Sequence, residues 1–186
     1  VIFGESVADR RLEFGRRLAQ EAPAQADIVV GMPESANVAA LGYSQESGIP
    51  FQFGIARNQY VGRTFIQPKQ SDRDFKVGVK INAIRAILKG QRVVLVDDSL
   101  QRGTTLRSSV KKMRAAGATA VHVRIAAPPT QWPCFYGVDT PTRQELMASS
   151  HSLEEIRKYI RADSLGYLTT ESMLSCVSKP KDYCTA

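Results

Sequence analysis

The sequence predicts an α/β protein in which an open, mainly parallel, twisted sheet carries helices on both faces. Three observations predict this class. Short apolar runs occur at residues 27–30, 92–96 and 120–125, and the run at 92–96 is apolar almost throughout, as in a central parallel strand that is covered on both faces. Segments with helical spacing of apolar residues separate these runs. The length of 186 residues is that of one ordinary domain or at most two small ones, which is long enough to bury a sizeable core.

The order of the elements follows from periodicity and from the Gly and Pro residues that interrupt it. In the first half we expect a helix at residues 4–21, a strand at 27–30, a helix at 37–47 and a strand at 49–55. In the second half we expect a helix at 81–88, a strand at 92–96, a helix at 105–116 and a strand at 120–125. A small C-terminal α/β add-on should follow, with helices at 142–149 and 152–160, a strand at 165–168 and a helical turn at 171–177.

Residues 57–79 interrupt this alternation with charges, amides and two glycines that follow no period. The segment therefore predicts a long flexible loop. Loops of this length are uncommon inside compact domains and often cover a site, with simple disorder as the alternative.

Composition narrows the class of partner. The net charge of +7 favours anionic partners, which could be nucleic acid, phosphorylated metabolites or another protein. No apolar run approaches the roughly 20 residues that cross a bilayer, and Val1 opens no signal segment. The three cysteines are an odd number far apart in sequence, which favours a reducing cytoplasm or an incomplete metal site over a disulfide scaffold, so a cytoplasmic protein is expected. His122 and His151, the two histidines, are interpreted as structural.

The segment after the strand at 92–96 is where a ligand is expected, because open parallel sheets bind ligands at the carboxyl ends of their strands. Gly103 permits a tight turn, and Thr104 and Thr105 then place hydroxyls and unpaired N–H groups at a helix start, where a phosphate fits. Asp97 and Asp98 can accept hydrogen bonds from vicinal sugar hydroxyls or hold Mg²⁺. Together these groups indicate a ribose 5-phosphate. The alternative is a capped helix beside solvated carboxylates. No Walker loop or G-x-G-x-x-G segment supports an ATPase or a dehydrogenase.

The string Asp97-Asp98-Ser99 followed by Arg102-Gly103-Thr104-Thr105 resembles the phosphoribosyl pyrophosphate (PRPP) motif of type I phosphoribosyltransferases. Further segments are similar to the glutamine PRPP amidotransferase family, namely residues 32–36, 60–66, 126–129, 133–139, 154–157 and 162–165. The resemblance implies a phosphoribosyltransferase domain at 1–178 with a tail at 179–186, and the family's N-terminal glutaminase domain has no counterpart here. Leu100-Gln101 departs from the two aliphatic residues that the family usually carries there.

The resemblance implies a reaction in which ammonia attacks C1 of PRPP, which releases pyrophosphate and forms 5-phosphoribosylamine in the first step of purine synthesis. It assigns PRPP binding to Ser35, Asp97, Asp98, Ser99, Arg102, Gly103, Thr104 and Thr105. Mg²⁺ would be held by Asp97, Asp98 and Ser35. The catalytic set is Arg57, Tyr60, Arg63, Asp97 and Asp98, in which the residues of the long loop clamp pyrophosphate and exclude water.

Other expectations rest on the same resemblance. One branch of the family holds a [4Fe–4S] cluster, and Cys134 and Cys184 match two of its four ligand positions, so a cluster is expected only in a longer parent chain and unligated thiols here. The implied partners are the glutaminase domain of the parent enzyme, purine nucleotides as feedback inhibitors, and further copies of the chain in a homo-oligomer. Nucleic acid and membranes are not expected. The alternatives are a non-catalytic PRPP-sensing regulator and a base-salvage phosphoribosyltransferase.

Overall fold

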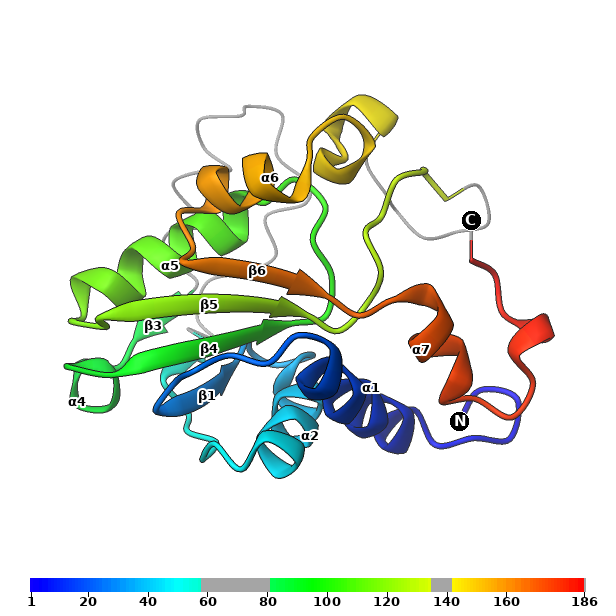
Figure 1. The fold of residues 1–186 in the computed structure, drawn as a ribbon, viewed down its shortest axis with the longest axis horizontal. Helices are drawn as coiled ribbons and strands as arrows, with labels where there is room; N and C mark the ends of the chain where they lie inside the picture. The colour runs from blue at the N-terminus through cyan, green and yellow to red at the C-terminus, as the bar shows by residue number, and fades with distance from the viewer. Residues whose placement is uncertain (58–80, 135–141, 186) are drawn as a thin grey trace.

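The main sheet has four strands in the order β1-β4-β5-β6, and every neighbouring pair is parallel (Figure 1). The computed structural model describes residues 1–57, 81–134 and 142–185. The strands are β1 (Ile28–Gly31), β4 (Arg92–Asp97), β5 (Ala120–Ile125) and β6 (Ser164–Tyr167). The parallel sheet confirms the predicted class, and β6 joins the sheet at its edge as part of the C-terminal addition.

Helices cover both faces of this sheet, as Figure 1 shows. One face carries α1 (Val7–Glu21), α2 (Asn37–Ser47) and α7 (Thr170–Ser175). The other carries α5 (Thr104–Ala115) and α6 (Leu153–Ile160). Because side chains alternate along a strand, each face needs its own apolar set, and this explains why residues 92–96 are apolar almost throughout.

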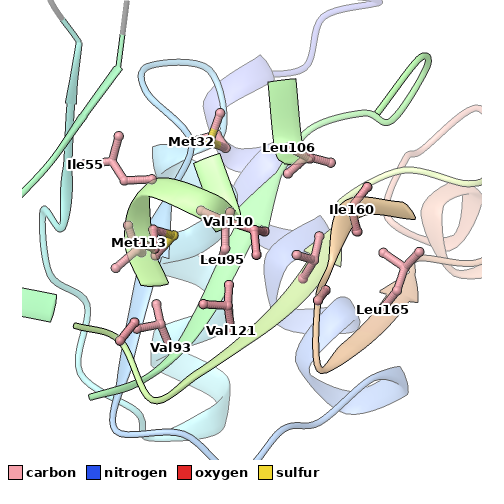
Figure 2. Packing of buried hydrophobic residues seen from close by; sticks show 14 of the residues in the cluster. Met32, Ile55, Val93, Leu95, Leu106, Val110, Met113, Val121, Ile160 and Leu165 are labelled. Carbon is pink, nitrogen blue, oxygen red and sulfur yellow. The ribbon is translucent and has the colours of Figure 1, made fainter. Parts of the chain in front are cut away.

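The larger of the two apolar clusters lies between the sheet and α5 and α6 (Figure 2). Val93 and Leu95 of β4 point into it and pack with Val110 and Met113 of α5. Val94 and Val96, the alternate residues of the same strand, belong to the cluster beneath α1 and α2. The strand is therefore fixed from both sides, which gives the segment that follows it a rigid base.

α1 and α2 approach each other at backbone distance. A Cβ on Gly15 of α1 would lie 1.9 Å from the carbonyl oxygen of Ala39, and a Cβ on Gly42 of α2 would lie 2.0 Å from that of Leu12. Both glycines are therefore required by close packing and not by an unusual φ angle. The sequence pattern gave no indication of this contact.

A buried arginine, Arg124 of β5, joins the sheet to the end of α1. Its Nε donates to the carbonyl of Ala22 at 2.6 Å, and its Nη2 donates to that of Pro23 at 2.9 Å. Its Nη1 donates to the Ser164 hydroxyl of the neighbouring strand at 2.9 Å. These carbonyls lie just past the C-terminus of α1, where the helix dipole favours a positive charge.

Two predicted elements before β4 are wrong. The strand expected at 49–55 is reduced to β2 (Ile55–Arg57), with a single parallel bridge from Phe51 to Val29 upstream. The helix expected at 81–88 begins as β3 (Ile81–Ala83), which pairs antiparallel with β2, and only α4 (Arg85–Leu88) is helical. Apolar residues at 81, 84, 87 and 88 fit a helix locally, but pairing with β2 decides the conformation of the first three.

The helix expected at 142–149 is also wrong, since the chain forms two 3₁₀ turns, η1 (Arg143–Glu145) and η2 (Met147–Ser149). Leu146 separates them with extended backbone at φ −81° and ψ 110°, and its side chain is fully buried. The extended backbone of Leu146 interrupts the helical hydrogen bonds, and the second turn meets the segment after β4, where the N–H of Met147 donates to the Gln101 carbonyl at 3.0 Å.

The described ends of the chain pack against each other. The ring of Phe3 meets that of Tyr183 edge-on at 5.1 Å, and the N–H of Ser178 donates to the Glu5 carboxylate at 2.8 Å. A last 3₁₀ turn, η3 (Pro180–Asp182), lies between these contacts. None of the helices in the described ranges has the length and apolar character that spanning a bilayer requires.

Candidate functional site

A hollow of about 270 Å³ opens where β4 ends and α5 begins, and residues 97–106 line it. The edge of the sheet is fixed there, because the N–H of Met32 donates to the Val96 carbonyl and that of Ala126 donates to the Asp97 carbonyl, both at 2.8 Å. The ends of β1, β4 and β5 thus meet at one edge, as expected for a ligand site in a parallel sheet.

Gly103 starts α5 in the left-handed region at φ 70° and offers no side-chain cap. The first N–H groups of a helix have no acceptor within it, so those at the start of α5 are available to a ligand oxygen in the hollow. The same N-terminus carries the positive end of the helix dipole. Together with the hydroxyls of Thr104 and Thr105, this end of α5 suits a phosphate.

Two partly buried carboxylates, Asp97 and Asp98, lie beside this helix start. The N–H of Asp98 donates to Asp97 Oδ1 at 2.9 Å, and the Ser99 hydroxyl donates to Asp98 Oδ1 at 3.3 Å. Burial, and then the charge of Asp98, raise the pKa of Asp97 to about 8. A cation or hydroxyl donors placed between the carboxylates would relieve this repulsion.

Arg102 leaves the loop between β4 and α5 to meet Glu145 of η1. Its Nε and Nη2 donate to the two carboxylate oxygens at 3.2 and 3.1 Å. This hydrogen bonding lowers the pKa of Glu145. Glu145 was not among the predicted site residues; its Thr-x-x-Glu spacing is that of a capping box, which could have located the turn but not its arginine partner.

The structure groups only part of the predicted site. Seven predicted residues line the hollow together: Asp97, Asp98, Ser99, Arg102, Gly103, Thr104 and Thr105. Ser35 is exposed in the turn before α2, after a cis peptide bond between Pro33 and Glu34, and is not part of that lining. Arg57 ends β2, where it pairs with Ile81. Tyr60, Arg63 and the rest of the proposed lid up to residue 79 lie outside the described residues.

The cysteines are separated by environment. Cys134 is half-buried, Cys176 is buried and Cys184 is exposed, and none of them forms a disulfide. Within residues 1–57, 81–134 and 142–185, no group of three or more His, Cys, Asp or Glu side chains could hold a metal ion. The described residues therefore do not support an iron–sulfur site.

Comparison with known proteins identifies one family model and several close relatives. A family model described as the phosphoribosyl transferase domain matches residues 10–130. The amidophosphoribosyltransferase of Bacillus subtilis (strain 168) is 50% identical over 181 residues, which are 97% of this chain and 38% of that protein. The protein of the same name from Mycobacterium bovis is 48% identical over 191 residues, which are 100% of this chain and 36% of that protein. The chain thus spans less than two fifths of these relatives.

Two solved structures are similar over nearly the whole chain. One is the glutamine PRPP amidotransferase from B. subtilis complexed with ADP and GMP, with a TM-score of 0.86 and 50% identity over 96% of this chain and 39% of that one. The other is described as the allosteric regulatory enzyme of purine biosynthesis, with a TM-score of 0.86 and 49% identity over 99% of this chain and 40% of that one.

Proposed function

The chain belongs to the phosphoribosyl transferase domain family, and from this premise we propose that it performs the phosphoribosyl transfer of an amidophosphoribosyltransferase. In this reaction ammonia attacks C1 of PRPP, pyrophosphate leaves and 5-phosphoribosylamine forms, which is the first step of de novo purine biosynthesis. The observation that carries the proposal is that two carboxylates and an uncapped helix start line the same hollow.

In the proposed complex, different residues of the hollow bind different parts of PRPP. The N–H groups at the start of α5 and the hydroxyls of Thr104 and Thr105 would bind the 5-phosphate. Asp97 and Asp98 would accept hydrogen bonds from the ribose hydroxyls, and this fixes the ring with C1 accessible to ammonia. The ribosyl centre gains positive charge as pyrophosphate departs, so nearby carboxylates stabilise it without forming a bond to it.

Mg²⁺ fits the residues present. Asp97 and Asp98 provide hard oxygen ligands whose mutual repulsion a cation would relieve, and Mg²⁺ commonly takes one or two protein carboxylates and completes its shell with water and substrate oxygens. We propose that these two aspartates hold it, with the Ser35 hydroxyl as a third ligand. When bound, the ion supplies charge neutralisation for the departing pyrophosphate.

The remaining catalytic assignments concern the leaving group and water. Arg57 is exposed at the end of β2, next to the segment that contains Tyr60 and Arg63. We propose that these three residues bind pyrophosphate and exclude the water that would compete with ammonia.

An iron–sulfur cluster does not fit this chain. A [4Fe–4S] cluster needs four thiolates, whereas only Cys134 and Cys184 match the ligand pattern. The buried Cys176 donates its thiol to the Ser172 carbonyl at 3.2 Å, so it is engaged elsewhere. No step of the reaction is assigned to such a cluster.

The proposed partners follow from the family. The B. subtilis relative was solved in complex with ADP and GMP, and we propose that purine nucleotides bind this chain as feedback inhibitors. A glutaminase domain that supplies ammonia, a homo-oligomeric assembly and a cytoplasmic location are further proposals.

Pyrophosphate release from PRPP and Mg²⁺ tests the function, with ammonia, glutamine or each purine base as the second substrate. We expect release with ammonia, because it is the nucleophile of the proposed reaction, and no dependence on a purine base. Release that requires a purine base would instead identify a salvage enzyme. Binding of PRPP without release under any condition would identify a sensor.

A further inference from the structure

The 3₁₀ turn η1 contacts two loops at the carboxyl edge of the sheet. Glu145, at one end of the turn, pairs with Arg102 of the loop after β4. Arg143, at the other end, stacks on Trp132 of the segment after β5, with its guanidinium carbon 3.7 Å from the ring centroid. A turn of three residues therefore bridges the loop of the hollow and the segment after the neighbouring strand.

Glu145 is held from both sides. While Arg102 binds both carboxylate oxygens, Oε2 also accepts the N–H of Thr142 at 3.2 Å and its hydroxyl at 3.3 Å, which closes a capping box. The N–H of Glu145 donates back to the Thr142 carbonyl at 2.9 Å. Few rotamers satisfy all of these contacts, so the carboxylate presents Arg102 with a fixed partner.

The residues on either side of Arg102 are held by η2. The N–H of Met147 donates to the Gln101 carbonyl at 3.0 Å. The Met147 sulfur lies where a side chain on Gly103 would have to go, 2.8 Å from an ideal Cβ there. Three consecutive loop residues, 101 to 103, thus each contact a residue of the segment 145–147.

We infer that Glu145 is a positioning residue for PRPP binding: through Arg102 it keeps residues 101–103 in the conformation that opens the start of α5 to the 5-phosphate. The inference rests on the proposed function and adds to it a residue outside the hollow. Glu145 is not in the lining, and its side chain reaches the loop through Arg102.

The exposure of the Arg102–Glu145 ion pair distinguishes a role in positioning the loop from a role in stabilising the fold. Both side chains are almost half exposed, and pairs of this kind contribute little to global stability. Loss of Glu145 should therefore leave the fold intact but free the loop. A freed loop must be ordered when PRPP binds, and this ordering weakens the affinity.

The test compares Glu145→Gln and Glu145→Ala with the matched control Glu154→Gln. Glu154 of α6 makes the same two-point pair with Arg157, at 2.6 Å for each contact, but does not touch the loop. The measurements are the Kd for PRPP with Mg²⁺, kcat and KM with ammonia, Tm, and amide hydrogen exchange of residues 99–106 without ligand.

For Glu145→Gln we expect the Kd and KM for PRPP to rise roughly 5- to 20-fold, with kcat changed less than about threefold. Exchange in the loop should accelerate while Tm stays close to that of the unchanged protein. The control should alter none of these. Equal exchange and equal Kd in Glu145→Gln and Glu154→Gln would overturn the inference.

A double-variant cycle tests the route through Arg102. If Glu145 acts only through Arg102, Arg102→Ala combined with Glu145→Ala should bind PRPP no more weakly than Arg102→Ala alone. If instead the double variant shows the product of the two single-variant increases in Kd, that route is refuted. If the unchanged protein fails to bind PRPP, the proposed function is wrong, and hydrogen exchange of the loop still decides whether Glu145 orders it.

Discussion

Gly15 of α1 rests directly on the main chain of Ala39 in α2, and a Cβ at position 15 would lie 1.9 Å from the Ala39 carbonyl oxygen. α2 follows the turn that contains Ser35, so this contact helps to fix the position of that turn at the carboxyl edge of the sheet. The contact is with backbone, which cannot rotate away as a side chain would. Any side chain at position 15 must therefore separate the two helices.

Gly15→Ala should destabilise the protein by about 3 kcal/mol, at the upper end of the cost of overpacking, despite the higher helix propensity of Ala. Urea unfolding measures this. The control is Gly48→Ala, where a Cβ has no atom within 4 Å but the φ of 72° is strained, so only about 1 kcal/mol is expected. A smaller loss for Gly15→Ala than for Gly48→Ala would show that the helices can separate without cost.

His122 should make the stability fall in mild acid. Its Nδ1 lies 2.9 Å from the Ser164 hydroxyl, and burial, followed by the charge of Arg124, lowers its pKa. The charges of Arg92 and Arg114 act in the same direction, whereas that of Asp163 opposes them. The folded protein thus resists a proton that the unfolded chain takes up once the pH falls below about 6.5.

The free energy of unfolding should therefore decrease as the pH falls from about 7 through the ordinary histidine range, and stop changing on this account below the folded pKa. His122→Gln should remove this part of the pH dependence, while His151→Gln, at an exposed site, should not. Unfolding in urea at pH 5, 6 and 7 measures all three proteins. Parallel pH profiles for the unchanged protein and His122→Gln would contradict the prediction.

Residue pattern was sufficient to predict β4 and the loop after it, because the continuous apolar run and the Asp, Gly and Thr residues act locally. Periodicity failed at Ile81, where a helical spacing was overridden by pairing with Arg57. It failed again at Leu146, whose extended backbone separates two turns where one helix was predicted. At both places the chain pairs with a segment distant in sequence, since Ile81 pairs with Arg57 and the N–H of Met147 donates to the Gln101 carbonyl.

The candidate site shows the same limit. Residues that are consecutive in sequence were recovered together in one hollow, since a single turn brings them there. Glu145 lies 43 positions from Arg102, and no local signal links them. Likewise, the contact of Gly15 with Ala39 depends on how the two helices cross. The spacing of residues within each helix does not predict that crossing.

Thr105→Val should chiefly weaken the binding of PRPP. Thr105 lines the hollow at the first turn of α5, and removing a hydroxyl from a phosphate site costs about 1 to 3 kcal/mol. The Kd for PRPP with Mg²⁺, measured by calorimetry, should therefore rise roughly 5- to 150-fold. Thr119→Val, at an exposed threonine before β5, is the control. A fall in kcat with unchanged affinity would refute the phosphate-binding role.

Asp98→Asn should instead lower turnover, by roughly a hundredfold or more, because the carboxylate stabilises the charge that develops at the ribosyl centre only as pyrophosphate leaves. The amide of Asn keeps the size and one hydrogen-bond acceptor, so affinity for PRPP should change much less than kcat. The N–H of Asp98 donates to Asp97 Oδ1, and Asp98 Oδ1 accepts the Ser99 hydroxyl. Burial chiefly raises the pKa of Asp97, and the substitution removes the charge of Asp98 that raises it further. The ligand-free protein should therefore be no less stable, which separates a catalytic loss from unfolding.

The control is Asp182→Asn, at an exposed carboxylate of η3, which should leave kcat unchanged. If Asp98→Asn turns over at the rate of Asp182→Asn, Asp98 has no catalytic role.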